Sequence, residues 1–410
     1  MENLPEDCLL LILSYLDLKS QLSLCDLHSR FPIILNYHWQ SRYKTNDISI
    51  NAMEFNINDL HHLFQNICQF IKKIRIKFAE AGHLQVLTSY IYPNVDDLRF
   101  HVTSKMSVTD SDMSKILNSF PNLKTLSPMG NFTGKEFVNY KGLESLTLSY
   151  CTSKFKVENF QKLMIQNRLK EIKLELFDAK CVEYIKLHKE SVSNLEMITI
   201  DDNEFPWFSK HFEVMNHLKE LHISGTECRN ETFRRSFIEE LRLVKSKRPL
   251  HSLEFGFRNH WQDSLDHEYL FDIVDSTLYV DILKIVSMRI SIANRHNIRE
   301  NIKQLYFKNC NFASREFFNN ILFKAKYLDV ISFDNCTFDF SEEVFVFDAT
   351  KMREECFNKQ TIYLIDNQYE SQVVSDFKWE VRHPHKLFEV CTEKTISYSY
   401  YPISICFKNE

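Results

Sequence analysis

Residues 143–151 read LESLTLSYC, and this stretch contains the pattern on which the fold depends. Leu143, Leu146 and Leu148 follow the order apolar-x-x-apolar-x-apolar, and Cys151 comes three residues after the last of them. The alternation at positions 146 and 148 predicts a short strand with one buried face. We expect the small side chain of Cys151 to fill a tight turn after that strand rather than to bind a metal.

The same pattern recurs along most of the chain. Eleven copies begin between Ile71 and Leu328, and their ten intervals over 257 residues average just under 26 residues. This spacing lies within the 20–29-residue period of leucine-rich repeats. The copies are Ile71-Ile74-Ile76, Val95-Leu98-Phe100, Leu123-Leu126-(Pro128), Leu143-Leu146-Leu148, Leu169-Ile172-Leu174, Leu195-Ile198-Ile200, Leu218-Leu221-Ile223, Leu250-Leu253-Phe255, Val280-Leu283-Ile285, Ile302-Leu305-Phe307 and Leu328-Ile331-Phe333. The small anchor residue after the strand is present in four copies, as Cys151, Asn203, Cys310 and Cys336.

Stretches with helical periodicity lie between the copies. A short apolar face is formed by Val157, Phe160 and Leu163. A longer one is formed by Phe233, Phe237, Ile238, Leu241 and Val244. Repeated strand–helix units stack into a solenoid with its parallel strands on the concave side. The predicted fold class is therefore α/β, with a leucine-rich-repeat solenoid that has a curved parallel sheet and helices on the convex side.

The N-terminal residues predict a separate helical unit. Pro5 suits the first turn of a helix, because its missing N–H would have no partner there. An apolar stripe at helical spacing follows, formed by Leu9, Ile12, Leu13 and Leu16. Further helical segments are expected around Leu22 and Trp39. Three helices in about 40 residues bury too little surface to be stable alone, so this unit needs a partner or a neighbouring domain.

The stretch LPEDCLLLILSYLDLKSQLSLCDLHSRF, residues 4–31, resembles an F-box. The positions that carry the resemblance are Leu4-Pro5, Ile12-Leu13-x-Tyr15-Leu16, Asp17, Leu22 and Cys25. The family usually has a Val-Cys pair followed by Arg-Trp, and here Leu24-Cys25 and Arg30-Phe31 stand in those places. With the repeats included, the chain is similar to the F-box–leucine-rich-repeat family over most of its length.

This resemblance implies a non-catalytic substrate-recognition subunit of an SCF-type ubiquitin ligase. The F-box would bind a Skp-family adaptor, which links to a cullin, and the repeats would bind a protein substrate for ubiquitination. The family divides its F-box residues between its own core and the adaptor. The residues carried over as adaptor-binding are Leu4, Pro5, Ile12, Leu13, Leu16, Leu22 and Cys25.

Two alternatives remain open. The chain could be a leucine-rich-repeat interaction scaffold with no ubiquitin role, in which the N-terminal helices merely cap the array. It could also be an extracellular repeat ectodomain, although the signal peptide and disulfide-clamped caps expected of that class are not seen. The predicted domains are an F-box at 1–45, a linker or N-terminal cap at 46–70, the solenoid at 71–370 and a C-terminal cap at 371–410. Two period-two segments in the last region predict strands, Phe377-Trp379-Val381 and Ile403-Ile405-Phe407.

The strand residues between the buried positions are expected to face the concave surface. In the first two copies these are mostly basic, namely Lys73, Arg75, Lys77, Arg99 and His101. In later copies they are mostly acidic, with Glu171, Glu175, Asp201, Glu220, Glu254 and Asp334. We interpret the basic residues as a substrate-binding surface for an acidic or phosphorylated segment. Two rival interpretations stay open: the basic residues form an ordinary solvated face, or Asp47, Glu54 and Asp59 neutralise them within the chain.

The sequence gives little support for chemistry. Only six glycines are present, and no Walker, G-x-S-x-G or H-E-x-x-H motif occurs, so we expect no enzyme activity and no cofactor. No metal site is predicted, because the His260-x-x-Asp263 and His267-Glu268 group matches no ligand spacing. Cys391 and Cys406 have no adjacent histidine that would activate a thiol for thioester formation.

Charge and hydropathy limit the compartments and partners. A net charge of −5 gives no general attraction to nucleic acid, so none is expected as a partner. The longest apolar run, Cys8 to Leu13, is far shorter than the ~20 residues of a membrane span. Acidic residues precede that run, which is unlike a signal peptide. The eleven cysteines are dispersed with no C-x-x-C pair, so we expect reduced thiols and a cytoplasmic or nuclear location.

Overall fold

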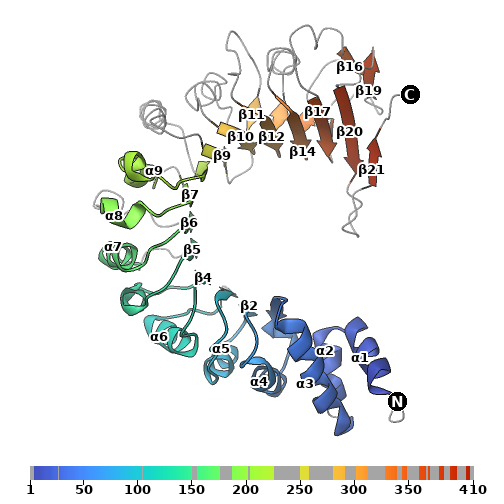
Figure 1. Cartoon of the computed structure of the whole chain (residues 1–410), viewed down its shortest axis with the longest axis vertical. Coiled ribbons are helices and arrows are strands. Elements are labelled where there is room, and N and C mark those ends of the chain that lie inside the picture. Colours follow the sequence, from blue (N-terminus) through green and yellow to red (C-terminus); the bar gives the residue numbers. More distant parts are fainter. Residues whose placement is uncertain are drawn as a thin grey trace. The chain divides into compact units, whose positions relative to one another are not determined.

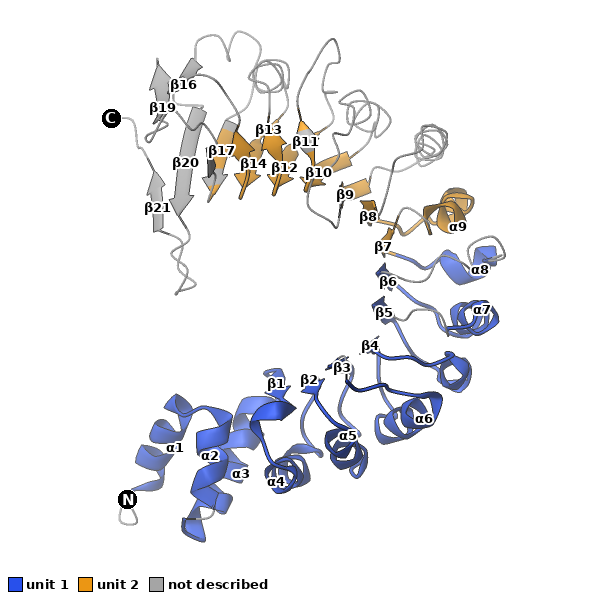
Figure 2. Ribbon diagram, turned by 180° about the vertical axis from the view of Figure 1, so that it is seen from behind, with its two compact units in different colours: residues 1–195 blue, residues 196–410 orange. Residues whose placement is uncertain are grey.

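A computed structural model covers the whole chain. The residues that it describes are 4–25, 27–103, 105–149, 155–175, 187–201, 204–225, 250–257, 280–290, 302–312, 328–338, 344–348, 360–365, 368–369, 378–382, 388–394 and 403–406. The chain divides into two compact units, residues 1–195 (unit 1) and residues 196–410 (unit 2), which Figure 2 shows in different colours.

Unit 1 begins with three helices. These are α1 (Glu6–Tyr15), α2 (Leu18–Cys25) and α3 (Arg30–Tyr43). Pro5 stands at the N-cap of α1, one position before the first turn in which the sequence placed it, and two acidic residues occupy that turn. Pro32 lies inside the first turn of α3, where a missing N–H is tolerated.

The three helices adjoin the repeats through α3. The fully buried indole of Trp39 lies edge-on to the ring of His62 on α4, with 6.3 Å between ring centroids. Helix α4 (Ile57–Ile67) starts at a capping box: the N–H of Asp59 donates to Oδ1 of Asn56 (2.8 Å), and the N–H of Asn56 donates to Oδ2 of Asp59 (3.3 Å). The first repeat therefore supplies the neighbouring surface that a small helical unit requires.

The rest of unit 1 is a stack of strands with connections on one side. Six parallel strands pair in chain order: β1 (Ile48–Asn51), β2 (Lys73–Phe78), β3 (Asp97–Val102), β4 (Thr125–Ser127), β5 (Ser145–Ser149) and β6 (Glu171–Glu175). The connections contain α4, α5 (Ala81–Thr88), α6 (Asp110–Ser119), α7 (Val157–Gln166) and α8 (Lys189–Val192), with short 3-10 turns η1 (Ala52–Glu54) and η2 (Lys135–Asn139). Figure 1 shows helices α4 to α7 on one side of these strands.

Unit 2 continues the strand pattern. Eight strands pair in parallel: β7 (Met197–Asp201), β8 (Glu220–Gly225), β9 (Leu250–Phe257), β10 (Val280–Val286), β12 (Gln304–Lys308), β14 (Val330–Asp334), β17 (Gln360–Ile365) and β20 (Phe388–Lys394). Strand β21 (Ile403–Cys406) then adds antiparallel to β20. The described connections include α9 (Phe205–Ser209) and a 3-10 turn at Phe212–Val214.

Two smaller sheets accompany these strands in unit 2. One consists of β11 (Arg289–Ile290), β13 (Asn311–Phe312), β15 (Thr337–Phe338) and β18 (Gln368–Tyr369), and the other of β16 (Val344–Asp348) and β19 (Lys378–Arg382). The turns before β11, β13 and β15 have positive φ angles at Ser287 (54°), Asn309 (53°) and Asn335 (50°). Asparagine adopts this left-handed conformation more readily than most residues, because its short polar side chain can bond locally.

The anchor cysteines behave as the sequence predicts. The thiol of Cys310 donates to the carbonyl oxygens of Ile285 (3.5 Å) and Lys308 (3.4 Å). The thiol of Cys336 donates in the same way to Phe307 (3.4 Å) and Asp334 (3.5 Å). Both side chains are buried, so Cys310 fills the turn after β12 and Cys336 fills the turn after β14. Cys151 and Asn203 lie outside the described residues.

The predicted fold class is confirmed: helices at the N-terminus precede a long parallel sheet with helical connections. All the apolar positions of the eleven copies are buried except Leu218, which is half-buried. The short face predicted around Phe160 lies on α7, and both C-terminal strand segments overlap strands, β19 and β21. The longer face around Phe237 lies outside the described residues. The sequence did not predict β1 as a strand, and the proposed domain bounds stay a prediction.

Candidate functional site

The three N-terminal helices are joined by one buried polar side chain. The side-chain amide of Gln21, on α2, donates to the carbonyl oxygens of Leu13 (2.9 Å) and Leu16 (3.0 Å) at the end of α1. Its Oε1 accepts a hydrogen bond from Nε1 of Trp39 on α3 (2.7 Å). Gln21 therefore satisfies the last carbonyls of α1 and the indole N–H together, which fixes how the three helices meet.

The predicted adaptor residues separate by burial. Leu13 is 1% exposed and Leu22 is 5% exposed, so both belong to the core of the helical unit. Leu4, Leu16 and Cys25 are half-buried. Pro5 and Ile12 are exposed and are available to a partner. Ile12 therefore departs from the apolar stripe to which the sequence assigns it.

Additional exposed apolar residues lie on the same helices and on the turn between α2 and α3. Nine large apolar side chains are exposed in the described part of the chain, and six of them fall between residues 11 and 37. We call these six the exposed apolar set: Leu11, Ile12, Tyr15, Leu27, Ile33 and Tyr37. Tyr15 (83% exposed) and Ile33 (74% exposed) are the most open. A concentration of exposed apolar side chains is typical of a protein-interaction site.

Sequence periodicity did not single out most of this set. Leu11 and Tyr15 follow each other on one face of α1, and Ile33 and Tyr37 do so on α3, each pair at a spacing of four residues. Such pairs have the same spacing as core residues, so spacing alone does not show which face meets a partner. One signal in the sequence was available. The residues of α1 are apolar around most of the helix circumference, which is more apolar surface than a single buried face requires.

The polar residues at the ends of these helices have local roles. The carboxylate of Asp17 accepts a hydrogen bond from the N–H of Ser20 (2.7 Å) at the start of α2, and this bond lowers the pKa of Asp17. At the start of α3, the guanidinium of Arg30 donates to the carbonyl oxygen of Leu4 (3.1 Å) and lies 3.8 Å from Glu6. These contacts hold the N-terminal residues against α3.

A second candidate site is the outward surface of β2 and β3. We call its five residues the basic face: Lys73, Arg75, Lys77, Arg99 and His101. All are exposed except Arg99, which is half-buried. The parallel register places Arg75 beside Arg99 and Lys77 beside His101. The structure thus brings the five predicted residues together, although whether they bind a substrate stays a prediction.

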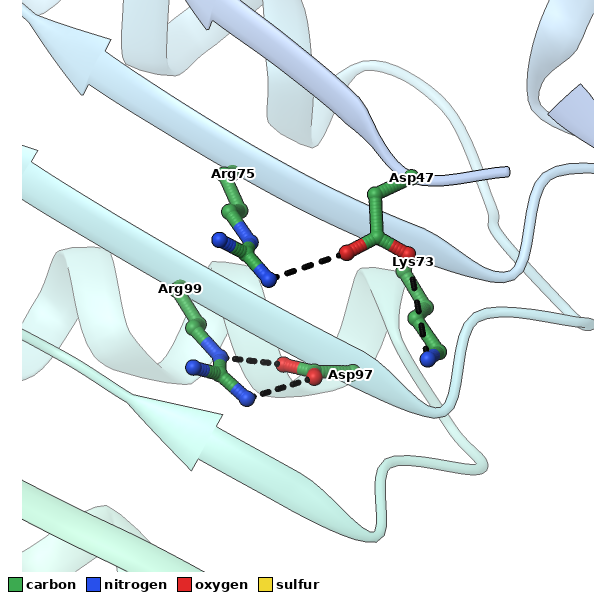
Figure 3. Close-up of polar contacts among 5 residues, drawn as sticks. All are labelled: Asp47, Lys73, Arg75, Asp97 and Arg99. Carbon is green, nitrogen blue, oxygen red and sulfur yellow. Dashed lines mark hydrogen bonds and ion pairs between the residues drawn. The ribbon is translucent and has the colours of Figure 1, made fainter. Parts of the chain in front are cut away.

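Two carboxylates contact the basic face, as Figure 3 shows. Asp47 precedes β1 and lies 3.0 Å from Nη2 of Arg75 and 3.7 Å from Nζ of Lys73. Asp97 accepts two hydrogen bonds from Arg99, from Nε and Nη2, both of 3.0 Å. The bonds to Asp97 raise the pKa of Arg99 above its ordinary value, so this guanidinium stays charged.

The other two acidic residues of the rival interpretation lie elsewhere. Glu54 accepts a hydrogen bond from the side chain of Asn51 (2.7 Å), and Asp59 caps α4. Neither forms an ion pair with the basic face among the described residues. Lys77 and His101 likewise have no carboxylate partner in the part of the chain that the structure describes. Neutralisation within the chain is therefore partial, and of the three residues only Asp47 takes part.

The later strands present a different surface. The outward residues of β4 and β5 are hydroxyl side chains, and β6 presents Lys173 between Glu171 and Glu175, with 2.9 Å between Lys173 and Glu175. In unit 2, His222 lies 3.5 Å from Glu220 and 3.9 Å from Glu254. Asp201 was predicted to face outward, but it is buried, and its N–H donates to the carboxylate of Glu204 (2.9 Å). The N–H of Glu204 in turn donates to the carbonyl oxygen of Asp201 (3.1 Å), so two hydrogen bonds join these residues at the end of β7.

The structure offers no arrangement for metal binding within its described ranges, where no group of three or more His, Cys, Asp or Glu side chains is placed to hold an ion. The residues around His260 and His267 lie outside those ranges. Cys391 and Cys406 are neighbours in register on β20 and β21. None of the described helices is long and apolar enough to cross a membrane.

Comparisons with known proteins give one family match and distant structural matches. No curated protein matches it. A similar solved structure is a crystal structure of a TLR13–ssRNA13 complex, with 13% sequence identity and a TM-score of 0.29. The match covers 81% of this chain and 59% of that chain, so the present chain spans less than two thirds of that protein's length. At the N-terminus, the family model described as the F-box domain matches residues 1–37, which contain α1, α2 and the first half of α3.

Proposed function

We propose that this chain is the substrate-recognition subunit of an SCF-type ubiquitin ligase. Residues 1–45 bind a Skp-family adaptor, which links the chain to a cullin. The repeats bind a protein substrate and hold it for ubiquitination by other subunits. In this proposal the chain itself performs no chemistry.

The observation that carries the proposal is the exposed apolar set, which lies within the residues that match an F-box. F-box domains are adaptor-binding modules, and such a module needs an apolar surface that is still open when the rest of the chain is folded. Tyr15 and Tyr37 are suited to this role, because aromatic side chains provide large contact areas and are enriched at interface centres. Burying this set on an adaptor would remove a large exposed apolar surface from water.

The scaffold alternative predicts a different surface. Helices that only cap a repeat array cover its end with their apolar face and turn polar residues to solvent. Here the unit already covers the repeats through Trp39 and α4, yet it still leaves six large apolar residues open. A further partner explains this excess better than a cap does.

The decisive experiment is co-purification of the full-length chain with a Skp-family adaptor. The double variant Tyr15→Asp with Ile33→Asp places two charges within the exposed apolar set without touching the buried Gln21 network. We expect it to lose the adaptor, because charges buried at an interface without partners are strongly unfavourable. The sequence-based variant, with Leu4→Ala, Pro5→Ala and Leu16→Asp, should lose it as well.

The matched control is Ile91→Asp with Ile165→Asp. These residues are also exposed large apolar residues of unit 1, at 54% and 55%, but they lie outside the three helices. The control should retain the adaptor, and circular dichroism should be the same for both double variants. If the Tyr15 and Ile33 variant still co-purifies with the adaptor, or the unchanged chain never does, the proposed function is wrong.

A further inference from the structure

The basic face is arranged in rows that cross β1, β2 and β3. The register aligns Ser49, Arg75 and Arg99 in one row, and Asn51, Lys77 and His101 in the next. Neighbouring strands in a sheet lie about 4.8 Å apart, so the cations of adjacent strands are close neighbours. Like charges directly opposite each other destabilise a sheet, so this arrangement is not explained by stability.

The carboxylates of the chain compensate only one end of the basic face. Asp47 forms ion pairs with Lys73 and Arg75, and Asp97 forms one with Arg99. Lys77 and His101 have no carboxylate partner among the described residues. Four permanent cations therefore face two carboxylates. The outward residues next along the sheet, on β4 and β5, are Thr125, Ser127, Ser145, Thr147 and Ser149, which are neutral hydrogen-bonding groups. An excess of positive charge thus lies beside a polar, uncharged surface.

The contacts of Asp47 indicate that the basic face accepts a carboxylate. Its two oxygens lie against different cations, 3.0 Å from Arg75 and 3.7 Å from Lys73. Asp47 is only partly buried, and both cations are about half-exposed. Exposed ion pairs contribute little to stability, so a carboxylate from another molecule can replace Asp47 at low cost.

The chemistry of the face favours a peptide over a nucleic acid. Proteins that bind single strands place aromatic side chains under the bases. The outward residues of β1 to β6 include no Phe, Tyr or Trp. The chain is acidic overall, with a net charge of −5, and β6 presents two glutamates that would repel a long polyanion. A short segment of alternating carboxylates avoids this repulsion.

We propose that the basic face binds an acidic peptide segment of a partner protein. One carboxylate of that segment takes the place of Asp47 at Arg75, and another pairs with Lys77 beside His101. Asp47 acts as an internal competitor that weakens binding of peptides with a single acidic residue. That the segment belongs to a ubiquitination substrate rests on the proposed function, whereas the binding itself does not.

Fluorescence anisotropy on the full-length chain tests this proposal. The ligand is a short fluorescein-labelled peptide in which glutamate alternates with glycine. The variant Arg75→Glu with Lys77→Glu should weaken binding by about tenfold or more, because it opposes like charges across the interface. The variant Asp47→Asn should strengthen binding, since it removes the competing carboxylate and keeps the side-chain size. Added salt should weaken binding of the unchanged chain.

The charge-matched control is Lys115→Glu with Lys162→Glu, on the exposed sides of α6 and α7. It changes the net charge by the same amount and should bind as the unchanged chain does. An equal loss in the control, no effect of Asp47→Asn, or no saturable binding would overturn the proposal. Tighter binding of a phosphoserine counterpart would overturn the carboxylate assignment. Binding of single-stranded oligo-dT that responds to the same variants would overturn the choice of a peptide.

Adaptor co-purification of the same variants keeps the two proposals apart. The basic face is separate from the exposed apolar set, so Arg75→Glu with Lys77→Glu should retain the adaptor. A chain that binds the peptide but never the adaptor would support the peptide surface and remove the ligase role. A chain that binds the adaptor but not the peptide would support the ligase role and overturn the peptide surface.

Discussion

The indole Nε1 of Trp39 donates a 2.7 Å hydrogen bond to Oε1 of Gln21, and both side chains are almost completely buried. The side-chain amide of Gln21 also donates hydrogen bonds to the carbonyl oxygens of Leu13 and Leu16. One glutamine therefore links α1, α2 and α3. Buried polar groups that are fully paired fix a unique arrangement, and the same groups are costly when one partner is lost.

This arrangement predicts the effect of Gln21→Ala. The change leaves the Trp39 N–H without its acceptor and removes the donor from two carbonyls, which should cost about 1–3 kcal/mol for each group left unsatisfied. The loss should be local to the helical unit. Hydrogen exchange measured by mass spectrometry should show faster exchange in peptides from α1 to α3.

Gln40→Ala provides the comparison for this experiment. Gln40 is an exposed residue of α3 whose side-chain amide donates to Oδ1 of Asn36 on the same helix (3.2 Å), its one side-chain partner among the described residues. Its replacement should leave exchange in the three helices close to that of the unchanged chain. Equal protection in the Gln21 and Gln40 variants would mean that the buried network does not hold the unit together.

A second prediction concerns the two faces of the strands. Leu146, Ile198, Leu221 and Leu305 are at most 1% exposed, which confirms their inward orientation. Replacing any one of them by Ala should cost roughly 2–5 kcal/mol, because it removes buried methyl groups and leaves a cavity. Thr147 and Thr199 face outward and should tolerate Ala within about 0.5 kcal/mol. Denaturant unfolding would measure both sets, and similar losses in the two would contradict the strand register.

The buried face of each repeat strand was predictable because apolar and polar residues alternate along it. The apolar positions of a copy such as Leu143-Leu146-Leu148 are all buried, and a strand of period two leaves no other choice of face. β1 was harder to predict because Ile48 and Ile50 lack the third apolar anchor of the repeat. The strand forms because it pairs in register with β2, which is a tertiary cause that a local pattern does not contain.

The candidate sites were predictable to different degrees. The basic face follows from strand alternation, since neighbouring outward residues must share one surface. The exposed apolar set did not follow, because Leu13 and Tyr15 look alike in an apolar helix although one is buried and the other open. Gln21 gave no signal at all, since a polar residue in a short helix ordinarily faces solvent. Asp47, Glu54 and Asp59 were equal candidates until the structure placed only Asp47 against the cations.

Thiol reactivity gives a third prediction. Burial raises the pKa of the Cys336 thiol, so at mildly alkaline pH it remains protonated, while Cys8 is exposed to solvent. Only the thiolate attacks an alkylating reagent. Brief treatment of the folded chain with iodoacetamide should therefore label Cys8 and spare Cys336, as read by mass spectrometry. Both should be labelled after denaturation, and labelling of Cys336 in the folded chain would show that the repeat opens there.

The last prediction concerns charges that link successive repeats. Glu144, just before β5, lies 2.6 Å from Nζ of Lys170 and 4.0 Å from Nζ of Lys124, so one carboxylate bridges the repeats on both sides. The bond to Lys170 lowers the pKa of Glu144 below its ordinary value. A lowered pKa in the folded state means that the ion pairs add stability above the ordinary glutamate pKa of about 4.3. That stability is lost as the pH falls through the folded-state value.

Glu144→Gln should therefore lower the denaturant midpoint at neutral pH, and its difference from the unchanged chain should shrink as the pH falls below about 4.3. The side chains are partly exposed, so the effect should be at most about 1 kcal/mol and should diminish in high salt. Glu158→Gln, on the exposed side of α7, removes a carboxylate that forms no ion pair with another described residue and should show no such trend. A difference that stays constant from neutral to acidic pH would mean that Glu144 contributes through packing or hydrogen bonding rather than through its charge.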